Sequence, residues 1–359
     1  MSKKIVTRRD IAERTGVSVS VVSRALNNSG YVETSKKKKI LQIAEELGYY
    51  PHPVAMSLQK RRTRQILFFC EDLTNSFNIE LYRGMISAAQ RRGYMVVMNG
   101  DMDFKSIKDI MVDGIIMPNE NATEHYLNTI GKNYHLPIVT NAYGNSVHFK
   151  KSVPLVEIDM YRVMEVAMAY LKKMGHRKIA LAIPYCFEDL NARTQAFKEL
   201  MSPQYGEDIQ RYYISSNLKE VESDTDILAL IQDQRLARDV FGGQDYFLHG
   251  QIAAIKYKKR KTRATAVICF NDEFAAGFCK QIECIGMRVP KDVSVIGIDG
   301  SYIRRYVHPF LTSVAIYPHS QGECCVDVLV DIIEGKKTKY VTRLPVKVIE
   351  GETVVAIQT

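Results

Sequence analysis

The cysteine and histidine side chains of this sequence, which could act as nucleophiles or metal ligands, lack the spacings that such chemistry requires. The chain has seven cysteines and eight histidines, and no two cysteines form a C-x-x-C pair. This pattern fits neither a disulfide framework nor a zinc ribbon, so we expect reduced thiols, no metal site and a cytoplasmic protein. His176, in an M-G-H-R-K turn, is expected to be structural.

Sequence signatures of common enzymes are missing as well. The chain contains no G-x-G-x-x-G segment, no phosphate-binding P-loop, no H-E-x-x-H zinc motif and no G-x-S-x-G nucleophile turn. The adjacent carboxylates Glu71 and Asp72 follow a strand-like run, but adjacency alone does not assign an acid and a base. We therefore expect a protein without enzymatic activity and without a cofactor.

The excess positive charge lies entirely at the N-terminus. Residues 1–64 hold 14 Lys and Arg against 5 Asp and Glu, whereas the remaining 295 residues hold 35 of each kind. A basic segment ahead of a neutral body indicates that the first part binds a polyanion and the second has another task. No apolar run approaches the ~18 residues that span a bilayer, so no membrane partner is expected.

The basic segment contains apolar residues at helical spacing, which argues against a solvated basic tail. Thr7 and Asp10 begin a short helix that Gly16 ends, and Ser18 can cap a second helix that runs to about Asn27. A third helix is predicted from Thr34 or Ser35 to Gly48. Two short helices joined through a glycine turn, with a third beneath them, form a helix-turn-helix unit.

The body alternates between β-rich runs and helical stretches such as 80–92, 161–174 and 272–285. Such alternation predicts parallel sheets with crossover helices, and 295 residues suffice for two lobes. A ligand site is then expected beyond the carboxyl ends of the strands, in the cleft between the lobes. The seven candidate strands are QILFFC, YMVVMN, GIIMP, LPIVTN, KIALAI, ATAVICF and VSVIGID.

The segment VTRRDIAERTGVSVSVVSRALNNSGYVETSKKKKILQIAEELGYYPHPVAMSL closely resembles the head of lactose-repressor/galactose-repressor family regulators. The body resembles the same family less densely, in LYRGMISAAQRRGYMVVMNG, VDGIIMP, MGHRKIALAIP, ARTQAFKEL, FNDEFAAGFCKQIECIGMRVPKDVSVIGIDG and HPFLTSV. The resemblance implies an all-α helix-turn-helix head and hinge helix, joined to a two-lobed α/β core with parallel sheets like that of periplasmic sugar-binding proteins. Its domains are the head 1–50, the hinge 51–61 and the core 62–359. The lobe near DNA takes about 62–160 and 294–320, and the far lobe about 161–293 and 321–345.

The resemblance also implies roles for residues of the head. The second helix enters the major groove of an operator, and its exposed side chains read the bases: Val19, Ser20 and Arg24. Other polar side chains are expected on phosphates, with capping or a plain surface position as the alternative for Ser23 and Asn27: Thr7, Ser18, Ser23, Asn27 and Tyr31. In the hinge, Val54, Ala55 and Leu58 contact the minor groove, where Leu58 is the wedge between base pairs. The alternative for Leu58 is packing on the core.

In the core, the resemblance points to five effector-binding residues: Phe77, Arg193, Asn271, Asp272 and Asp299. Their guanidinium, amide and carboxylate groups suit a polyhydroxylated or anionic small molecule. The alternatives are structural, because Asn271 and Asp272 can cap a helix and Asp299 can fix a turn. Asn78 stands where the family usually has a second aromatic, and one crossover after residue 100 is short. The basic run 258–263 is expected to be a solvated loop, with a second polyanion contact as the alternative.

Together these features predict a sequence-specific regulator of transcription, expected to be a repressor. It would bind a pseudo-palindromic double-stranded DNA operator as a homodimer, under control of a small metabolite such as a sugar or sugar derivative. A regulator of the same class that is controlled by a protein partner, or without an effector, is the alternative. A carbohydrate-binding protein with an inert basic arm is a third possibility, which DNA binding separates from the other two.

Overall fold

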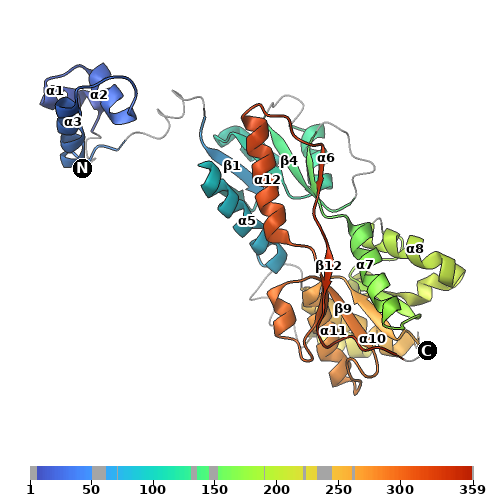
Figure 1. Ribbon diagram of the computed structural model, residues 1–359. Coiled ribbons are helices and arrows are strands. Elements are labelled where there is room, and N and C mark those ends of the chain that lie inside the picture. The colour runs from blue at the N-terminus through green and yellow to red at the C-terminus, as the bar shows by residue number, and fades with distance from the viewer. Residues whose placement is uncertain are drawn as a thin grey trace. The chain divides into compact units, whose positions relative to one another are not determined.

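The computed structural model describes residues 6–50, 62–70, 72–130, 136–144, 153–189, 191–220, 224–232, 245–260 and 263–357 (Figure 1). The chain divides into two compact units, with the boundary between Thr63 and Arg64. The predicted hinge at 51–61, with Val54, Ala55 and Leu58, lies outside the described residues, as does Glu71. Among the described residues, no helix is long and apolar enough to cross a membrane.

The first unit contains the three helices that the sequence predicts. Gly16, at φ 74°, ends the first of them in a left-handed conformation that suits glycine. The Ser18 hydroxyl accepts a 3.4 Å bond from the Val21 amide and caps the second. The helices enclose a small core that includes Ile11, Val22, Ala25, Ile40 and Ala44. They are α1 (Arg8–Thr15), α2 (Val19–Asn27) and α3 (Thr34–Glu46).

The second unit consists of two lobes, each built on a sheet of six described strands. The sheet of the first lobe has the order β11-β5-β4-β3-β1-β2, and its pairs are parallel. Ile66 and Phe68 of β1 join the core beneath the helices α5 and α12, whereas Leu67 and Phe69 join the core on the other face. The strands are β1 (Gln65–Phe69), β2 (Met95–Asn99), β3 (Gly114–Met117), β4 (Ile138–Ala142), β5 (Leu155–Glu157) and β11 (Val341–Arg343).

The helical elements of this lobe are α5 (Ser76–Arg92), η1 (Phe104–Asp109), α6 (Glu120–Asn128) and α12 (Pro318–Ile333). The short 3-10 helix η1 stands between β2 and β3, so the prediction of a shortened crossover there is confirmed. In Figure 1, α5 and α12 run side by side along one face of the sheet.

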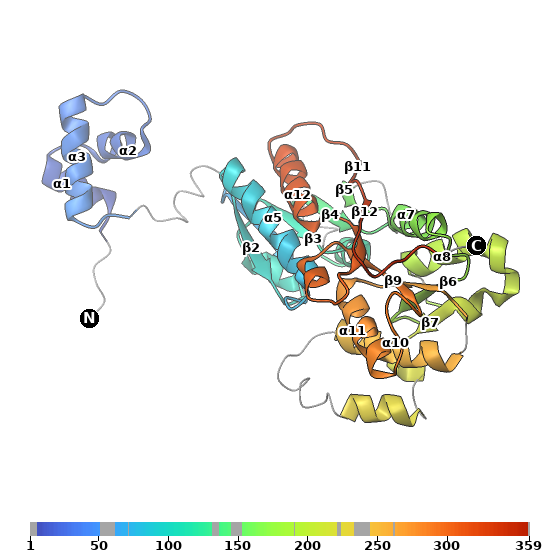
Figure 2. The ribbon, with the colours of Figure 1, turned by 60° about the horizontal axis from the view of Figure 1, so that its bottom comes forward.

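The sheet of the second lobe has the order β12-β10-β9-β8-β6-β7, with only the β10–β12 pair antiparallel among its described strands. Its helices α10 and α11 pack closely on each other, as Figure 2 shows below the sheet. The strands are β6 (Ile179–Ile183), β7 (Tyr213–Ser215), β8 (Ala266–Cys269), β9 (Ser294–Asp299), β10 (Thr312–Ala315) and β12 (Lys347–Ile349). The helices are α7 (Met160–Lys173), α8 (Ala192–Tyr205), η4 (Gly206–Tyr212), η5 (Leu218–Glu220), α10 (Tyr246–Arg260), α11 (Asp272–Cys284) and η6 (Tyr302–Arg305).

The predicted division of the core into lobes is wrong in its C-terminal part. Residues 294–320 were expected in the first lobe, but β9 pairs with β8 and β10 pairs with β9 in the second sheet. Residues 321–345 were expected in the second lobe, but α12 packs on α5 and β11 pairs with β5 in the first. The chain therefore crosses between the lobes after β5, after β10 and after β11.

Glycines allow α12 to approach α5 closely. A Cβ atom on Gly84 of α5 would lie 1.9 Å from the His319 carbonyl oxygen, and one on Gly322 of α12 would lie 2.0 Å from the Leu81 carbonyl oxygen. In the second lobe, the helices α10 and α11 approach each other closely in the same way, at Gly250 and Gly277. In both lobes, glycine is thus required where two helices nearly touch.

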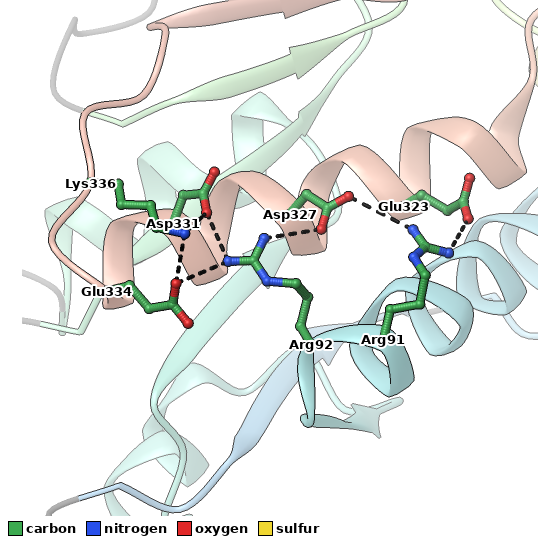
Figure 3. Close-up of polar contacts among 7 residues, drawn as sticks. All are labelled: Arg91, Arg92, Glu323, Asp327, Asp331, Glu334 and Lys336. Atoms are coloured by element: carbon green, nitrogen blue, oxygen red, sulfur yellow. Dashed lines mark hydrogen bonds and ion pairs between the residues drawn. The ribbon is translucent and has the colours of Figure 1, made fainter.

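Ion pairs join the far end of α5 to α12 (Figure 3). Arg92 binds Asp331 at 2.7 Å, Glu334 at 3.2 Å and Asp327 at 3.2 Å, and Arg91 binds Glu323 at 2.8 Å. The Arg92 side chain is 22% exposed, so these pairs are partly shielded from solvent. The crossing helix α12 is therefore fastened to the first lobe by charge as well as by packing.

The predicted basic loop 258–263 begins as helix rather than loop, although its first three side chains are exposed as expected, and residues 261 and 262 lie outside the described residues. Lys258, Lys259 and Arg260 form the last turn of α10. The Lys258 ammonium donates to the Ile285 carbonyl, and the Arg260 guanidinium donates to a carbonyl of β7. Lys259 pairs with carboxylates at 2.6 and 2.7 Å. The structure therefore gives these cations intramolecular partners, and a second polyanion contact finds no support.

Candidate DNA-binding and effector sites

The predicted base-reading residues share the exposed side of α2. Val19 is 44% exposed, and Ser20 and Arg24 are also exposed, whereas Val22 and Ala25 are buried in the head. An apolar side chain, a hydroxyl and a guanidinium are thus presented together on one short helix. The Val19 side chain can contact a thymine methyl, and the Ser20 hydroxyl can donate to or accept from a base edge. The Arg24 guanidinium can bind a guanine edge.

The residues predicted to contact phosphates have more varied surroundings. Tyr31 is 86% exposed. The Thr7 amide and hydroxyl both donate to Asp10, at 2.7 and 2.6 Å, and so close the start of α1. The Ser23 hydroxyl accepts from the Arg8 guanidinium at 3.1 Å and from the Asn27 amide at 3.4 Å. The structural alternative therefore has direct support at Ser23 and Asn27, whereas Tyr31 remains open to a ligand.

The cleft between the lobes of the core contains a cavity of about 360 Å³. Four of the predicted effector residues line it, namely Phe77, Arg193, Asn271 and Asp299. They come from the start of α5, the start of α8 and the ends of β8 and β9, so both lobes contribute. Asn78, which stands in place of an aromatic, also lines the cavity and donates to the Asp72 carbonyl at 2.8 Å.

Arg193 provides the positive charge of this cavity. Its guanidinium carbon lies 4.3 Å from the centre of the Phe270 ring, a cation–π contact. Its Nε atom is buried without a hydrogen-bond partner among the described residues. Burial lowers the pKa of Arg193, and the nearby Asp299 carboxylate opposes that shift. A buried guanidinium nitrogen without an acceptor is suited to a ligand oxygen.

Asp299 faces the same cavity and is held in a strained backbone conformation. Its φ of 118° is one that side-chain-bearing residues rarely adopt, and Gly300 follows it at φ 70°. Burial and the neighbouring Asp272 carboxylate raise the pKa of Asp299 well above its usual range, while Arg193 opposes this shift. The turn after β9 thus holds a buried carboxyl group beside the guanidinium.

The prediction that Asp272 binds the effector is wrong, because Asp272 does not line the cavity. It is fully buried, and its carboxylate accepts from the Ser313 hydroxyl and the Ser301 amide. Asn271 fulfils both predicted possibilities, since it caps α11 through a 2.8 Å bond from the Phe274 amide and also lines the cavity. Of the adjacent pair, only Asn271 can reach a ligand.

Several cavity residues were missed by the sequence analysis: Asn119, Tyr143, Tyr185, Asn191, Tyr246 and Phe270. Asn119 follows β3, Tyr143 follows β4 and Tyr185 follows β6. The rule that ligands bind at the carboxyl ends of parallel strands could have found these three residues. Burial raises the pKa of Tyr185, in keeping with its place inside the cleft.

Comparison with known proteins identifies the two parts of the chain. Residues 7–52 match the model of bacterial regulatory proteins of the lacI family, and residues 168–354 match that of the periplasmic binding protein-like domain. The chain belongs to the lacI family. It is therefore a DNA-binding transcription regulator with a helix-turn-helix head and a periplasmic-binding-protein-like core.

Relatives of this lacI-family protein match it over nearly its whole length. The HTH-type transcriptional repressor PurR of Vibrio vulnificus is 28% identical over 344 residues, which are 93% of either chain. Catabolite control protein A of Priestia megaterium is 28% identical over 349 residues, covering 94% of this chain and 93% of the relative. The first relative is named as a transcriptional repressor and the second as a control protein.

Solved structures share the fold of this lacI-family chain. A Lac repressor dimer bound to operator and the anti-inducer ONPF has a TM-score of 0.74 at 21% identity, covering 98% of this chain and 100% of that one. A complex of the regulator CelR with cellobiose has a TM-score of 0.64 at 21% identity, covering 97% and 99%. A regulator from Enterococcus faecium with bound ribose has a TM-score of 0.63 at 21% identity, covering 82% and 100%.

Proposed function

We propose that this lacI-family regulator is a repressor that binds a pseudo-palindromic operator as a homodimer and is controlled by a sugar or sugar derivative in the interlobe cleft. The observation that carries the proposal is the cleft itself, where the unpartnered Arg193 Nε and the buried Asp299 face one cavity of about 360 Å³. A ligand there contacts both lobes and can change their relative arrangement.

In the head, we assign base contacts to the exposed side of α2. Arg24 can bind a guanine edge through two hydrogen bonds, Ser20 can donate or accept, and Val19 can contact a thymine methyl. Thr7, Ser18 and Tyr31 are proposed phosphate contacts. The hinge residues Val54, Ala55 and Leu58 remain predicted minor-groove contacts. Support for this mode of action comes from the Lac repressor dimer of similar fold, which was solved bound to its operator.

The proposed control follows from the chain connections between the lobes. A ligand that binds more tightly to one arrangement of the lobes shifts the population toward it. The first lobe begins with β1 at Gln65, so a change in the position of this lobe is passed to the end of the predicted hinge that precedes it. Solved complexes of similar fold support the choice of ligand. CelR was solved with bound cellobiose, and the Enterococcus faecium regulator was solved with bound ribose.

The proposal is tested by DNA binding of the full chain to an operator selected from a random double-stranded pool. We expect a dimer on DNA, a steep fall in affinity with salt, and a loss of specific binding in Arg24→Ala. Arg211→Ala, an exposed arginine of the core, is the matched control and should leave binding unchanged. Specific binding that survives Arg24→Ala would contradict the assigned role of α2.

The effector part is tested separately by thermal unfolding of the full chain with sugars. A ligand at about 100 times its Kd should stabilise the protein by ~2.7 kcal/mol. Arg193→Ala should abolish this stabilisation without changing operator affinity in the absence of sugar. Intact operator binding that no sugar affects would instead favour control by a protein partner or constitutive repression.

A further inference from the structure

The Arg8 side chain connects α1 to the other two helices of the head. Arg8 is the first residue of α1, and its Nη1 atom donates to the Ser23 hydroxyl of α2 at 3.1 Å. Its Nε atom donates to the hydroxyl of Tyr49, which follows α3, at 3.2 Å. Two of the three guanidinium nitrogens are therefore held by the protein itself, before any DNA is bound.

The Arg8 guanidinium lies at the exposed side of α2. Ser23 follows Val19 by four residues and Ser20 by three, so these side chains emerge on the same face of the helix. Because the Ser23 hydroxyl is 3.1 Å from Arg8 Nη1, the charge of Arg8 stands next to the residues assigned to base contacts. Arg8 is half-buried in this position, whereas Arg24 is exposed.

The positive charge of Arg8 has no negative partner in the described part of the head. Both of its acceptors are neutral hydroxyls, and no carboxylate among the described residues pairs with it. Arg92 of α5, which is also partly shielded from solvent, instead pairs with three carboxylates. A half-buried charge without a counter-charge is costly in the free protein, and a bound anion would offset that cost.

The remaining donors of Arg8 suit a phosphate better than a base edge. Its Nη2 atom, with two N–H groups, makes no hydrogen bond to a described residue. Reading guanine takes two parallel N–H groups, which a guanidinium provides from Nη2 together with Nε or Nη1, and both of those already donate to the protein. A phosphate oxygen needs one donor, and the first helix of a helix-turn-helix unit crosses the DNA backbone.

We infer that Arg8 binds a backbone phosphate next to the bases that α2 reads, and that the Ser23 and Tyr49 hydroxyls hold its guanidinium ready for this contact. Ser23 and Tyr49 are then positioning residues, while Arg8 adds affinity that carries no sequence information. The inference rests on the assignment of base contacts to α2 in the proposed function.

The salt dependence of DNA binding by the full chain tests the contact. Arg8→Gln should weaken binding to the selected operator and to unrelated DNA by similar factors. It should also lower the slope of log affinity against log salt by about 1.8 for a dimer, which loses two phosphate contacts. Arg8→Lys should restore most of the slope, because an ammonium binds phosphate as a point charge. Arg14→Gln, which removes the same charge from an exposed position in the last turn of α1, is the matched control and should change the slope less than half as much.

Two outcomes would overturn the contact. One is an unchanged slope in Arg8→Gln, and the other is a loss confined to the selected operator, which would identify a base contact instead. Either outcome leaves the proposed function standing as long as Arg24→Ala abolishes specific binding. Specific binding that survives Arg24→Ala contradicts the proposed function, whatever Arg8→Gln does.

Removing the two hydroxyls tests the positioning role. The double variant Ser23→Ala/Tyr49→Phe keeps every charge of the head and should weaken operator binding by about 5- to 50-fold, because two guanidinium groups per dimer must then be ordered on binding. In the Arg8→Gln background, the same double change should have little further effect, since no guanidinium is left to position. A loss of equal size in both backgrounds would show that the hydroxyls act only on the stability of the head, and would overturn their positioning role.

Discussion

The Asp272 carboxylate accepts a 2.5 Å hydrogen bond from the Ser313 hydroxyl, which ties the start of α11 to β10. Its second oxygen accepts from the Ser301 amide at 2.6 Å, just beyond β9. Gly297 of β9 makes room for the group, since a Cβ atom there would lie 2.4 Å from the carboxylate. Asp272 is therefore a buried residue that connects α11 to β10 and to the turn after β9, and it is not a ligand contact.

The buried Asp272 carboxyl group should make the stability of the core depend on pH. Burial raises the pKa of Asp272 to about 7, against about 4 for a free aspartate. The folded state then binds the proton more tightly, so the stabilising contribution is present below about pH 4 and is lost as the pH rises through about 7. In urea unfolding, Asp272→Asn should flatten the change in unfolding free energy across this range.

Glu273 also has a pKa raised to about 7, which gives a pH dependence in the same direction. It is present in both proteins, so its contribution cancels in the difference between their profiles, which reports on Asp272 together with Asp299, whose pKa the Asp272 carboxylate raises. Parallel profiles for the parent and Asp272→Asn would show that the carboxyl group at 272 does not take up the proton.

The helix crossing of the first lobe gives a second prediction. Gly84→Ala and Gly322→Ala should each lower the free energy of unfolding by about 1–3 kcal/mol, because the added methyl meets a backbone carbonyl that cannot move aside cheaply. Gly100→Ala is the control, since a Cβ atom there has its nearest neighbour at 3.8 Å. Equal stability of all three variants in urea unfolding would refute the close crossing.

The ion pairs of Arg92 give a third prediction. Arg92→Gln leaves Asp327 and Asp331 of α12, and Glu334 just after it, without this partner and should cost about 1 kcal/mol of unfolding free energy in low salt. The loss should shrink in about 1 M salt, where charges are screened over ~3 Å. Arg83→Gln, which breaks one exposed pair with Glu80 within α5, should cost less than about 0.5 kcal/mol. A loss that is independent of salt would assign the role of Arg92 to packing instead.

The head and the strands could be predicted from the sequence because their signals are local. Gly16 and Ser18 mark helix ends through their own backbone chemistry, and the buried strands appear as apolar runs. The lobe assignment of α12 could not be predicted in this way. It depends on the fit of Gly322 against α5 and on the pairing of β9 with β8, which are contacts between distant segments.

The cleft was predicted only in part, because some of its residues carry local sequence signals and others do not. Arg193, Asn271 and Asp299 stand in recognisable motifs, and all three line the cavity. Asp272 shares a motif with Asn271 but points into the core, because neighbouring residues at a helix start face different directions. Asn119 and Tyr143 stand in no recognisable motif, but each follows a strand that the sequence predicts, so only the rule on the carboxyl ends of parallel strands could have placed them at the cleft.

The two serines on α2 provide a final prediction that separates structure from recognition. Ser23 accepts from Arg8 at 3.1 Å, and Arg8 also donates to the Tyr49 hydroxyl at 3.2 Å, so this contact joins the helices of the head. Ser23→Ala should speed hydrogen exchange of the α1 amides, consistent with a loss of about 1 kcal/mol, and change operator affinity less than about threefold. Ser20→Ala, on the exposed side of the same helix, should do the reverse and weaken specific operator binding by about 1–2 kcal/mol with unchanged exchange. A large loss of affinity in Ser23→Ala with unchanged exchange would instead assign Ser23 to a phosphate contact.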